Sequence, residues 1–145
     1  MSLSFMSKAW RKAVSRWKNY NPNPVSRNVG DCSVRALTVA LGVDWETAFA
    51  LLSSNAFQMA DMMSSNAVIG SVLRQHGYRR SVIPNSCPDC YTVGEFADEH
   101  PEGTFVLGTG SHVVAVKDGE ILDSWDSSNE IPVYYWWRKD NGSVQ

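Results

Sequence analysis

The segment from Cys32 to Leu41 constrains the fold of this 145-residue chain more than any other. Asp31 in front of it is a favourable N-cap, and Gly42 behind it is a favourable residue to end a helix, so the segment is predicted to be helical. Its apolar side chains surround the helix and leave little polar surface; they are Val34, Ala36, Leu37, Val39, Ala40 and Leu41. A helix of this kind is buried. Other elements of the chain are therefore expected to enclose it.

The rest of the first half has helical periodicity. Asp44 can cap a second helix over about 45–53, with an inner stripe of Trp45, Ala48, Phe49 and Leu52. A third helix is predicted over 65–76, where His76 and Gly77 end it. Residues 54–64 are rich in Ser, Asn and Met, and no element is assigned to them.

The second half changes to the period of β-strands. Residues 78–83 are predicted as a short edge strand, and Thr92 with Glu95 matches the capping box of a short helix that ends before Pro101. Four strand-like segments follow, at 104–107, 112–116, 121–125 and 133–137. Helices first and an antiparallel sheet second indicate an α+β fold.

The first 24 residues are predicted to form a basic amphipathic helix and a linker, ahead of the main part of one compact domain at 25–145. The helix, over residues 5–20, places Trp10, Val14 and Trp17 on one face. We favour packing of this helix on its own domain. A helix that anchors the protein to a membrane surface or a partner has the same pattern.

Charge and hydropathy exclude some classes of protein. The net charge is −2, but residues 1–20 hold five basic and no acidic residues, which leaves eight basic and fifteen acidic residues in the remainder. An acidic body argues against nucleic acid as a partner. No apolar run has transmembrane length or the layout of a secretory signal peptide. These features predict a cytoplasmic protein whose three cysteines are thiols.

Cys32 is the strongest candidate for a nucleophile, because a helix N-terminus and a nearby imidazolium both lower the pKa of a thiol. Of the three histidines, His112 is the one that begins a strand, directly after the loop 108–111. His112 is therefore the expected partner of the thiol.

The predicted hairpin selects a third residue. A two-residue turn at Asp118-Gly119 pairs residue 114 with residue 123, so His112 and Asp123 become diagonal neighbours. Alternation puts them on the face that also carries Val114, Val116, Ile121 and Trp125. The same register points Asp126 away. Cys32, His112 and Asp123 therefore fit a nucleophile, a base and a group that orients the base.

These motifs resemble the papain-like cysteine peptidases. The segments 28–32, 110–116 and 123–126 are similar to those of bacteriocin-leader-processing peptidases and small phage-encoded relatives, within a resemblance that spans about residues 25–137. The resemblance implies a papain-like catalytic domain at 25–145, in which the nucleophile helix packs on the antiparallel sheet. It implies Cys32 as nucleophile, His112 as general base and acid, and Asp123 as the orienting residue.

The residues before Cys32 depart from the family pattern. Such peptidases commonly have a Gln six residues before the Cys that donates to the oxyanion, and Ser26 stands there. Asn28 is therefore assigned this role, with the backbone N–H of Cys32 as the second donor. Asp31 places a negative charge beside the thiol, which opposes thiolate formation unless Asp31 points into the backbone or pairs with Arg35.

The resemblance implies a cysteine peptidase that hydrolyses a peptide or isopeptide bond of a peptide or protein substrate through a thioester on Cys32. Acyl transfer to an amine would use the same three residues. The alternative from another class is a catalytically silent papain-like binding module, such as a phage structural component. No metal or cofactor is expected, and the sequence does not indicate an oligomeric state.

Cys87 and Cys90 form a Cys-x-x-Cys pair, which can be redox-active or half of a zinc site. No second pair exists, and the spacings to His76 and His100 match no familiar zinc module. Two thiols outside any metal or redox site are the favoured interpretation, with zinc and redox chemistry as alternatives.

Overall fold

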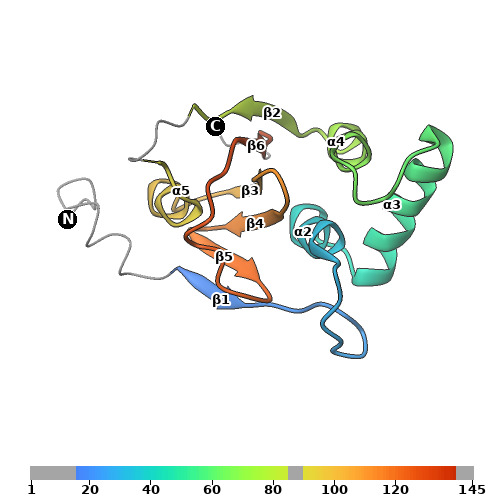
Figure 1. The fold of residues 1–145 in the computed structure, drawn as a ribbon, viewed down its shortest axis with the longest axis horizontal. Coiled ribbons are helices and arrows are strands. Elements are labelled where there is room, and N and C mark those ends of the chain that lie inside the picture. The colour runs from blue at the N-terminus through green and yellow to red at the C-terminus, as the bar shows by residue number, and fades with distance from the viewer. Residues whose placement is uncertain (1–15, 85–89, 140–145) are drawn as a thin grey trace.

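A mixed β-sheet organises the computed structural model, which describes residues 16–84 and 90–139. Over these residues the sheet has six strands in the order β1-β5-β4-β3-β6-β2 (Figure 1). β1 runs parallel to β5, and the other neighbouring pairs are antiparallel. The strands are β1 (Trp17–Asn19), β2 (Arg79–Val82), β3 (Thr104–Gly108), β4 (Val113–Lys117), β5 (Glu120–Asp123) and β6 (Tyr134–Trp137).

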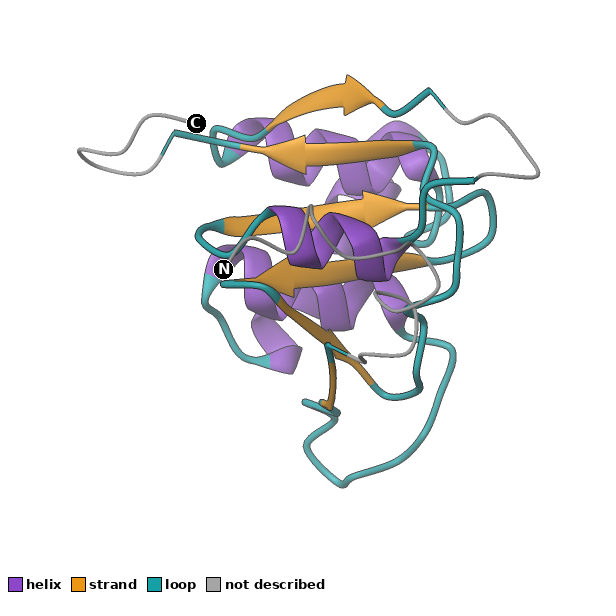
Figure 2. Ribbon diagram, turned by 90° about the vertical axis from the view of Figure 1, so that its left-hand side faces the viewer, coloured by secondary structure: helices purple, strands orange, loops and turns teal. Residues whose placement is uncertain are grey.

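Helices cover both faces of this sheet. One face carries α2 (Cys32–Leu41), α3 (Trp45–Met59) and α4 (Asn66–Gln75), and the other carries α5 (Val93–Glu99), which lies on the near side of the sheet in Figure 2. Successive strand residues point to opposite faces, so Val113 and Ala115 pack in the cluster under α2 to α4, whereas Val114 and Val116 pack in the cluster under α5. The prediction of an α+β fold is confirmed.

The predicted helix from Cys32 to Leu41 is confirmed, as is its burial. Leu37 is fully buried, and Val34, Ala36 and Ala40 are nearly so. Gly42 ends the helix in the left-handed conformation with φ 64°, which glycine adopts without a steric penalty. The helix packs mainly on β4 and α3 (Figure 1). Cys32, its first residue, is thereby held against the centre of the sheet.

Among the described residues, no single helix is long and apolar enough to cross a membrane. Helices α2 and α3 together reach that length and hydropathy, but their axes are bent by 111° at the break between them.

The helix predicted at 45–53 is longer in the structure. α3 continues to Met59, because buried Ala56 extends the inner stripe of Ala48 and Leu52 by one more turn. The unassigned segment 54–64 therefore contains the end of α3 and the turn into α4. α4 begins after its cap Ser65, within one residue of the prediction.

The predicted helix over 5–20 is wrong where the structure describes it. Trp17–Asn19 forms strand β1, an edge of the sheet, and residues 5–15 lie outside the described part. The backbone N–H of Tyr20 donates to the carbonyl of Asp123 at 2.8 Å, and that of Ile121 donates to the carbonyl of Arg16 at 2.9 Å. These bonds to β5 compete with helix formation. Part of the segment assigned to residues 1–24 thus belongs to the sheet of the main domain.

The elements of the second half agree with the prediction to within one or two residues. β2 is the predicted edge strand, and Thr92 caps α5 by accepting a hydrogen bond from the backbone N–H of Glu95 at 3.1 Å. Asp118 and Gly119, both with positive φ, form the predicted two-residue turn, with Val116 opposite Ile121.

Candidate active site

Cys32 lies at the edge of a pocket of about 360 Å³. The pocket is walled by the first turn of α2, the start of α4, the loop before β4 and the first residue of β6. Its lining residues include Cys32, Asn66, Gly110, Ser111, His112 and Tyr134. The thiol is half-buried and is not part of a disulfide. It can therefore meet a ligand that enters the pocket.

The structure brings His112 and Asp123 to this thiol. The imidazole of His112 is hydrogen-bonded to Cys32. Its Nε2 lies 2.7 Å from Oδ2 of Asp123, a fully buried carboxylate. Because Nε2 is taken by Asp123, Nδ1 is the ring nitrogen left for the thiol. The three side chains thus form one chain, in the order thiol, imidazole, carboxylate.

His112 and Asp123 meet on a different face of the sheet from the one that a regular hairpin predicts. The residues expected on the same face, Val114, Val116 and Ile121, pack under α5, whereas His112 and Asp123 contact Cys32 and Arg35 of α2. β4 begins at Val113 and β5 ends at Asp123, so both residues stand at strand ends, where simple alternation no longer holds. The pair was found correctly, but the face was wrong.

The carboxylate of Asp123 is held by four hydrogen bonds. Oδ2 accepts from His112 and from the hydroxyl of Ser127 at 2.7 Å, and Oδ1 accepts from Nε of Arg35 at 3.0 Å and from the backbone N–H of Ser124 at 2.8 Å. Asp123 and Ser127 are fully buried. A carboxylate fixed in this way holds the imidazole in one orientation. Asp126, by contrast, accepts from Ser128, so the sequence-based choice of Asp123 agrees with the geometry.

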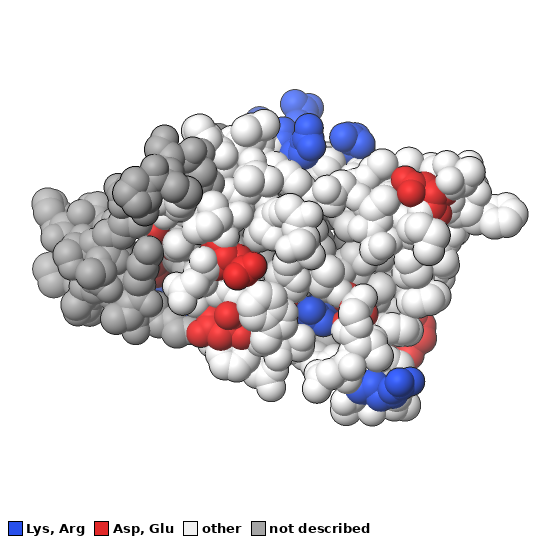
Figure 3. Space-filling view, in the orientation of Figure 1, with Lys and Arg blue, Asp and Glu red and all other residues white. Residues whose placement is uncertain are grey.

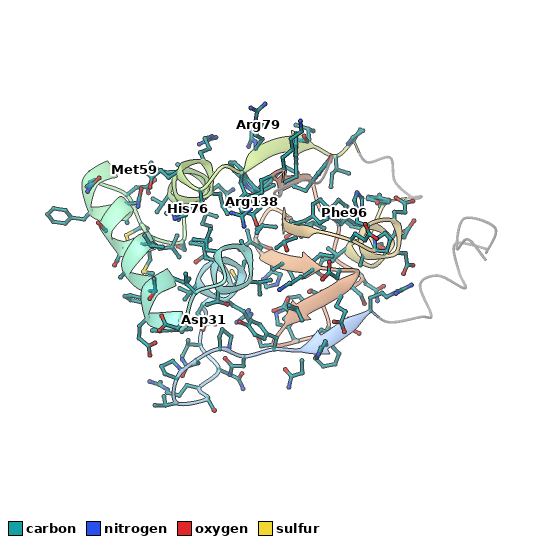
Figure 4. All side chains as sticks on the ribbon, turned by 180° about the vertical axis from the view of Figure 1, so that it is seen from behind. Asp31, Met59, His76, Arg79, Phe96 and Arg138 are labelled. Atoms are coloured by element: carbon teal, nitrogen blue, oxygen red, sulfur yellow. The ribbon has the colours of Figure 1, made fainter. Side chains whose placement is uncertain are left out.

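The charge of Asp31 is compensated by Arg35. Nη1 of Arg35 donates to Oδ1 of Asp31 at 2.6 Å, and the indole N–H of Trp45 donates to Oδ2 at 2.8 Å. Asp31 stands at the start of α2 (Figure 4), but its side chain makes no capping hydrogen bond to the helix. Arg35 therefore links Asp31 to Asp123 in a buried acid–base–acid arrangement.

The electrostatics favour a thiolate–imidazolium pair. Burial opposes ionisation of Cys32, but the hydrogen bond and positive charge of His112 outweigh it and lower the pKa of the thiol. Burial likewise opposes protonation of His112, yet the hydrogen bonds to Asp123 and Cys32 raise its pKa to about 9. Burial would raise the pKa of Asp123, but its bonds to His112 and Ser127 lower it. Each of the three shifts therefore favours the charged form of its group.

Trp125 covers the outer side of the imidazole. Its ring centroid lies 4.8 Å from that of His112, and the two planes are inclined by 47°. In the loop before β4, the hydroxyl of Thr109 accepts a hydrogen bond from the backbone N–H of His112 at 3.1 Å. These contacts fix the ring and limit the access of water to it.

The structure does not bring Asn28 to the pocket. Asn28 is exposed on the loop before α2, and its amide oxygen accepts a 3.4 Å hydrogen bond from Asn21. This loop is turned outward by Asn23, whose side chain binds the backbone N–H groups of Val25 and Arg27. An amide near the thiol is instead found on Asn66, at the start of α4.

Several residues around the site were missed by sequence reasoning. The phenol of Tyr134 donates to Oδ1 of Asn66 at 3.0 Å, which leaves the amide NH₂ of Asn66 for another acceptor. Neither residue has a sequence spacing that relates it to Cys32. Ser127 also has no such signal. Arg35 was expected as a partner of Asp31, but its bond to Asp123 was missed, although the one charged residue of a buried helix requires buried partners.

The expected pair of thiols at Cys87 and Cys90 is not what the structure contains. Cys90 is disulfide-bonded, and Cys87 lies outside the described residues. His76 and His100 each bond through Nδ1 to a backbone carbonyl of their own helix, at 2.8 and 2.7 Å. Within residues 16–84 and 90–139, no group of His, Cys, Asp or Glu side chains is arranged to hold a metal ion.

Comparison with known proteins finds no family model, curated protein or solved structure that matches this chain. Any statement about its activity therefore depends on the residues of the site themselves.

Proposed function

We propose that the protein is a cysteine peptidase of papain-like arrangement, which hydrolyses a peptide or isopeptide bond through a thioester on Cys32. The observation that carries the proposal is the chain of contacts from the Cys32 thiol through His112 to buried Asp123, beside an open pocket. A single cysteine or histidine would be weak support. A half-buried thiol with a lowered pKa, at a helix start and against an oriented imidazole, is the arrangement that activates a nucleophile.

The reaction follows from the charged pair. The Cys32 thiolate attacks the carbonyl carbon, forming a C–S bond and a tetrahedral oxyanion. The intermediate collapses as the C–N bond breaks, and the imidazolium of His112 gives its proton to the leaving amine. A water molecule then attacks the thioester while His112 accepts its proton, and the C–S bond breaks, which releases the carboxylic acid and restores the thiolate–imidazolium pair.

We assign the side-chain amide of Asn66 as a donor to the oxyanion, in place of Asn28. Asn66 and Cys32 line the same pocket, and the bond from Tyr134 occupies the amide oxygen of Asn66. The free N–H groups can then point at the acyl oxygen, with the backbone N–H of Cys32 at the start of α2 as a second donor.

Selective alkylation tests the nucleophile. Iodoacetamide at about pH 6 should label Cys32 much faster than an ordinary thiol, whose pKa is about 8.5, and His112→Ala should remove this advantage. His76→Ala is the matched control, since it removes an exposed histidine from the end of α4. Labelling of Cys32 no faster than that of free cysteine would favour the silent binding module instead.

Acyl transfer provides the second readout. p-Nitrophenyl acetate should acetylate Cys32, and intact mass should show the thioester form and then decay in water. Decay that requires an added amine would indicate an acyltransferase with the same three residues. Absence of any acetylated Cys32, despite rapid alkylation, would contradict the proposal.

A further inference from the structure

Basic side chains gather at the sheet edge formed by β2 and β6. Residues 74–84 and 133–139 contain five basic residues and no acidic residue, although the whole chain has more acidic than basic residues. We call this surface the arginine edge; its members are Arg74, Arg79, Arg80, Arg138 and Lys139. Figure 3 shows blue side chains together above the position of β2 and α4. In Figure 4, Arg79 points outward from β2.

Arginines at this edge lie against aromatic rings. The guanidinium of Arg74 lies 5.1 Å from the ring centroid of Trp136, and that of Arg80 lies 5.4 Å from the ring of Tyr134. Across the described residues, neither forms an ion pair, whereas Arg16 and Arg35 pair with aspartates. A guanidinium that stacks on a ring keeps its edge N–H groups for a carboxylate and loses less freedom on binding it. The edge is therefore prepared for anionic groups.

The arginine edge shares a residue with the candidate active site. Tyr134, under Arg80, lines the pocket beside Cys32 and bonds to Asn66. Burial raises the pKa of the Tyr134 phenol, which interacts electrostatically with both Arg80 and Cys32. The ring of Tyr134 thus lies between Arg80 and the pocket beside Cys32.

We propose that the arginine edge binds acidic side chains of the peptide or protein substrate, next to the segment whose acyl group reaches Cys32. The inference rests on the proposed peptidase function and adds a substrate class to it. A polypeptide is favoured over nucleic acid because the arginine edge is short and is made of residues 74–84 and 133–139. Thirteen acidic residues lie in the rest of the described chain and would repel a long phosphate backbone.

Binding of defined peptides tests the inference. The full chain with Cys32→Ser would be titrated against a fluorescein-labelled peptide that contains six glutamates, and against the same peptide with six glutamines. We expect at least roughly tenfold tighter binding of the glutamate peptide, weakened at least roughly tenfold by Arg74→Gln together with Arg80→Gln. Lys18→Gln with Arg27→Gln is the matched control, since it removes two exposed charges elsewhere.

The inference would be overturned by equal binding of both peptides, by equal weakening by the control pair, or by tighter binding of an oligothymidylate of the same charge. Protection of Cys32 from iodoacetamide by the glutamate peptide in the unmodified protein should accompany binding. Binding without protection would separate the edge from the pocket and refute its role in substrate recognition. Slow alkylation of Cys32 without any peptide is the distinct failure of the peptidase proposal.

Discussion

Replacing Arg35 by methionine should destabilise the protein more than any other single loss of a charge near the site. Arg35 has 5% of its surface exposed and donates to two buried carboxylates, Asp31 at 2.6 Å and Asp123 at 3.0 Å. Methionine preserves much of the aliphatic volume but no donor. The variant therefore isolates the effect of the guanidinium.

The expected cost can be obtained in two ways. Hydrogen bonds to charged groups contribute about 1.5–3 kcal/mol each, so losing two costs roughly 3–6 kcal/mol. Breaking one side of a buried ion pair costs about 3–5 kcal/mol. Trp45 still binds Asp31, and three donors still bind Asp123, so we expect a loss of about 3–5 kcal/mol rather than more.

The free energy of unfolding should be measured by urea titration at neutral pH and again at about pH 3, below the ordinary pKa of aspartate of about 3.9. The pKa of Asp123 is lowered in the folded protein, so its stabilising contribution is present above the ordinary pKa of aspartate and is lost as the pH falls through the folded value. Without Arg35 that contribution is smaller, and the two proteins should become more alike in acid. Arg27→Met, in an exposed loop, is the control and should change stability by less than about 0.5 kcal/mol.

The buried ion-pair role of Arg35 would be refuted by a loss below about 1 kcal/mol at neutral pH, a size typical of exposed ion pairs. It would also be refuted by a difference between the two proteins that is unchanged in acid. Either result would mean that water reaches Asp31 and Asp123 in place of the guanidinium.

Three further predictions concern the site. Asn66→Ala should slow acetylation of Cys32 by about 10²–10³-fold and leave its alkylation by iodoacetamide unchanged, since alkylation forms no oxyanion. Asn28→Ala is the control and should affect neither reaction. Equal acetylation rates for the two variants would exclude the assignment of Asn66. The ring protons of His112 should titrate at about pH 9 by NMR, and at lower pH in Cys32→Ser, because the thiolate that helps to stabilise the imidazolium is then absent. The stability that the raised pKa contributes is fully present below the ordinary pKa of histidine and is lost as the pH rises through about 9. Equal pKa values of His112 in the two proteins would contradict the pairing. Gly108→Ala should lower the free energy of unfolding in urea by about 1–3 kcal/mol, because the added Cβ would overlap the ring of Tyr134. Gly110→Ala is the control, since a Cβ at Gly110 meets open space. Similar losses for the two variants would contradict this packing.

Most elements could be predicted from the sequence because their signals are local. Gly42 at the end of Cys32–Leu41, the capping box at Thr92 and the turn at Asp118-Gly119 each act within a few residues. Strand β1 could not be predicted in this way. Its hydrogen bonds join Trp17–Asn19 to β5, about a hundred residues along the chain, and such pairing leaves no local pattern that distinguishes it from an amphipathic helix.

The candidate site also has some features that follow from local sequence signals and others that depend on long-range packing. The buried helix that begins at Cys32 and the approach of His112 to Asp123 across one hairpin could be predicted from the sequence, because apolar periodicity and hairpin register are short-range properties. Three features depend on the tertiary structure alone. They are the face of the sheet on which His112 and Asp123 meet, the link that Arg35 makes between Asp31 and Asp123, and the presence of Asn66 rather than Asn28 in the pocket. These contacts depend on how α2 and α4 pack against the ends of the strands. Packing brings together residues whose separation along the chain is unrelated to their distance in space.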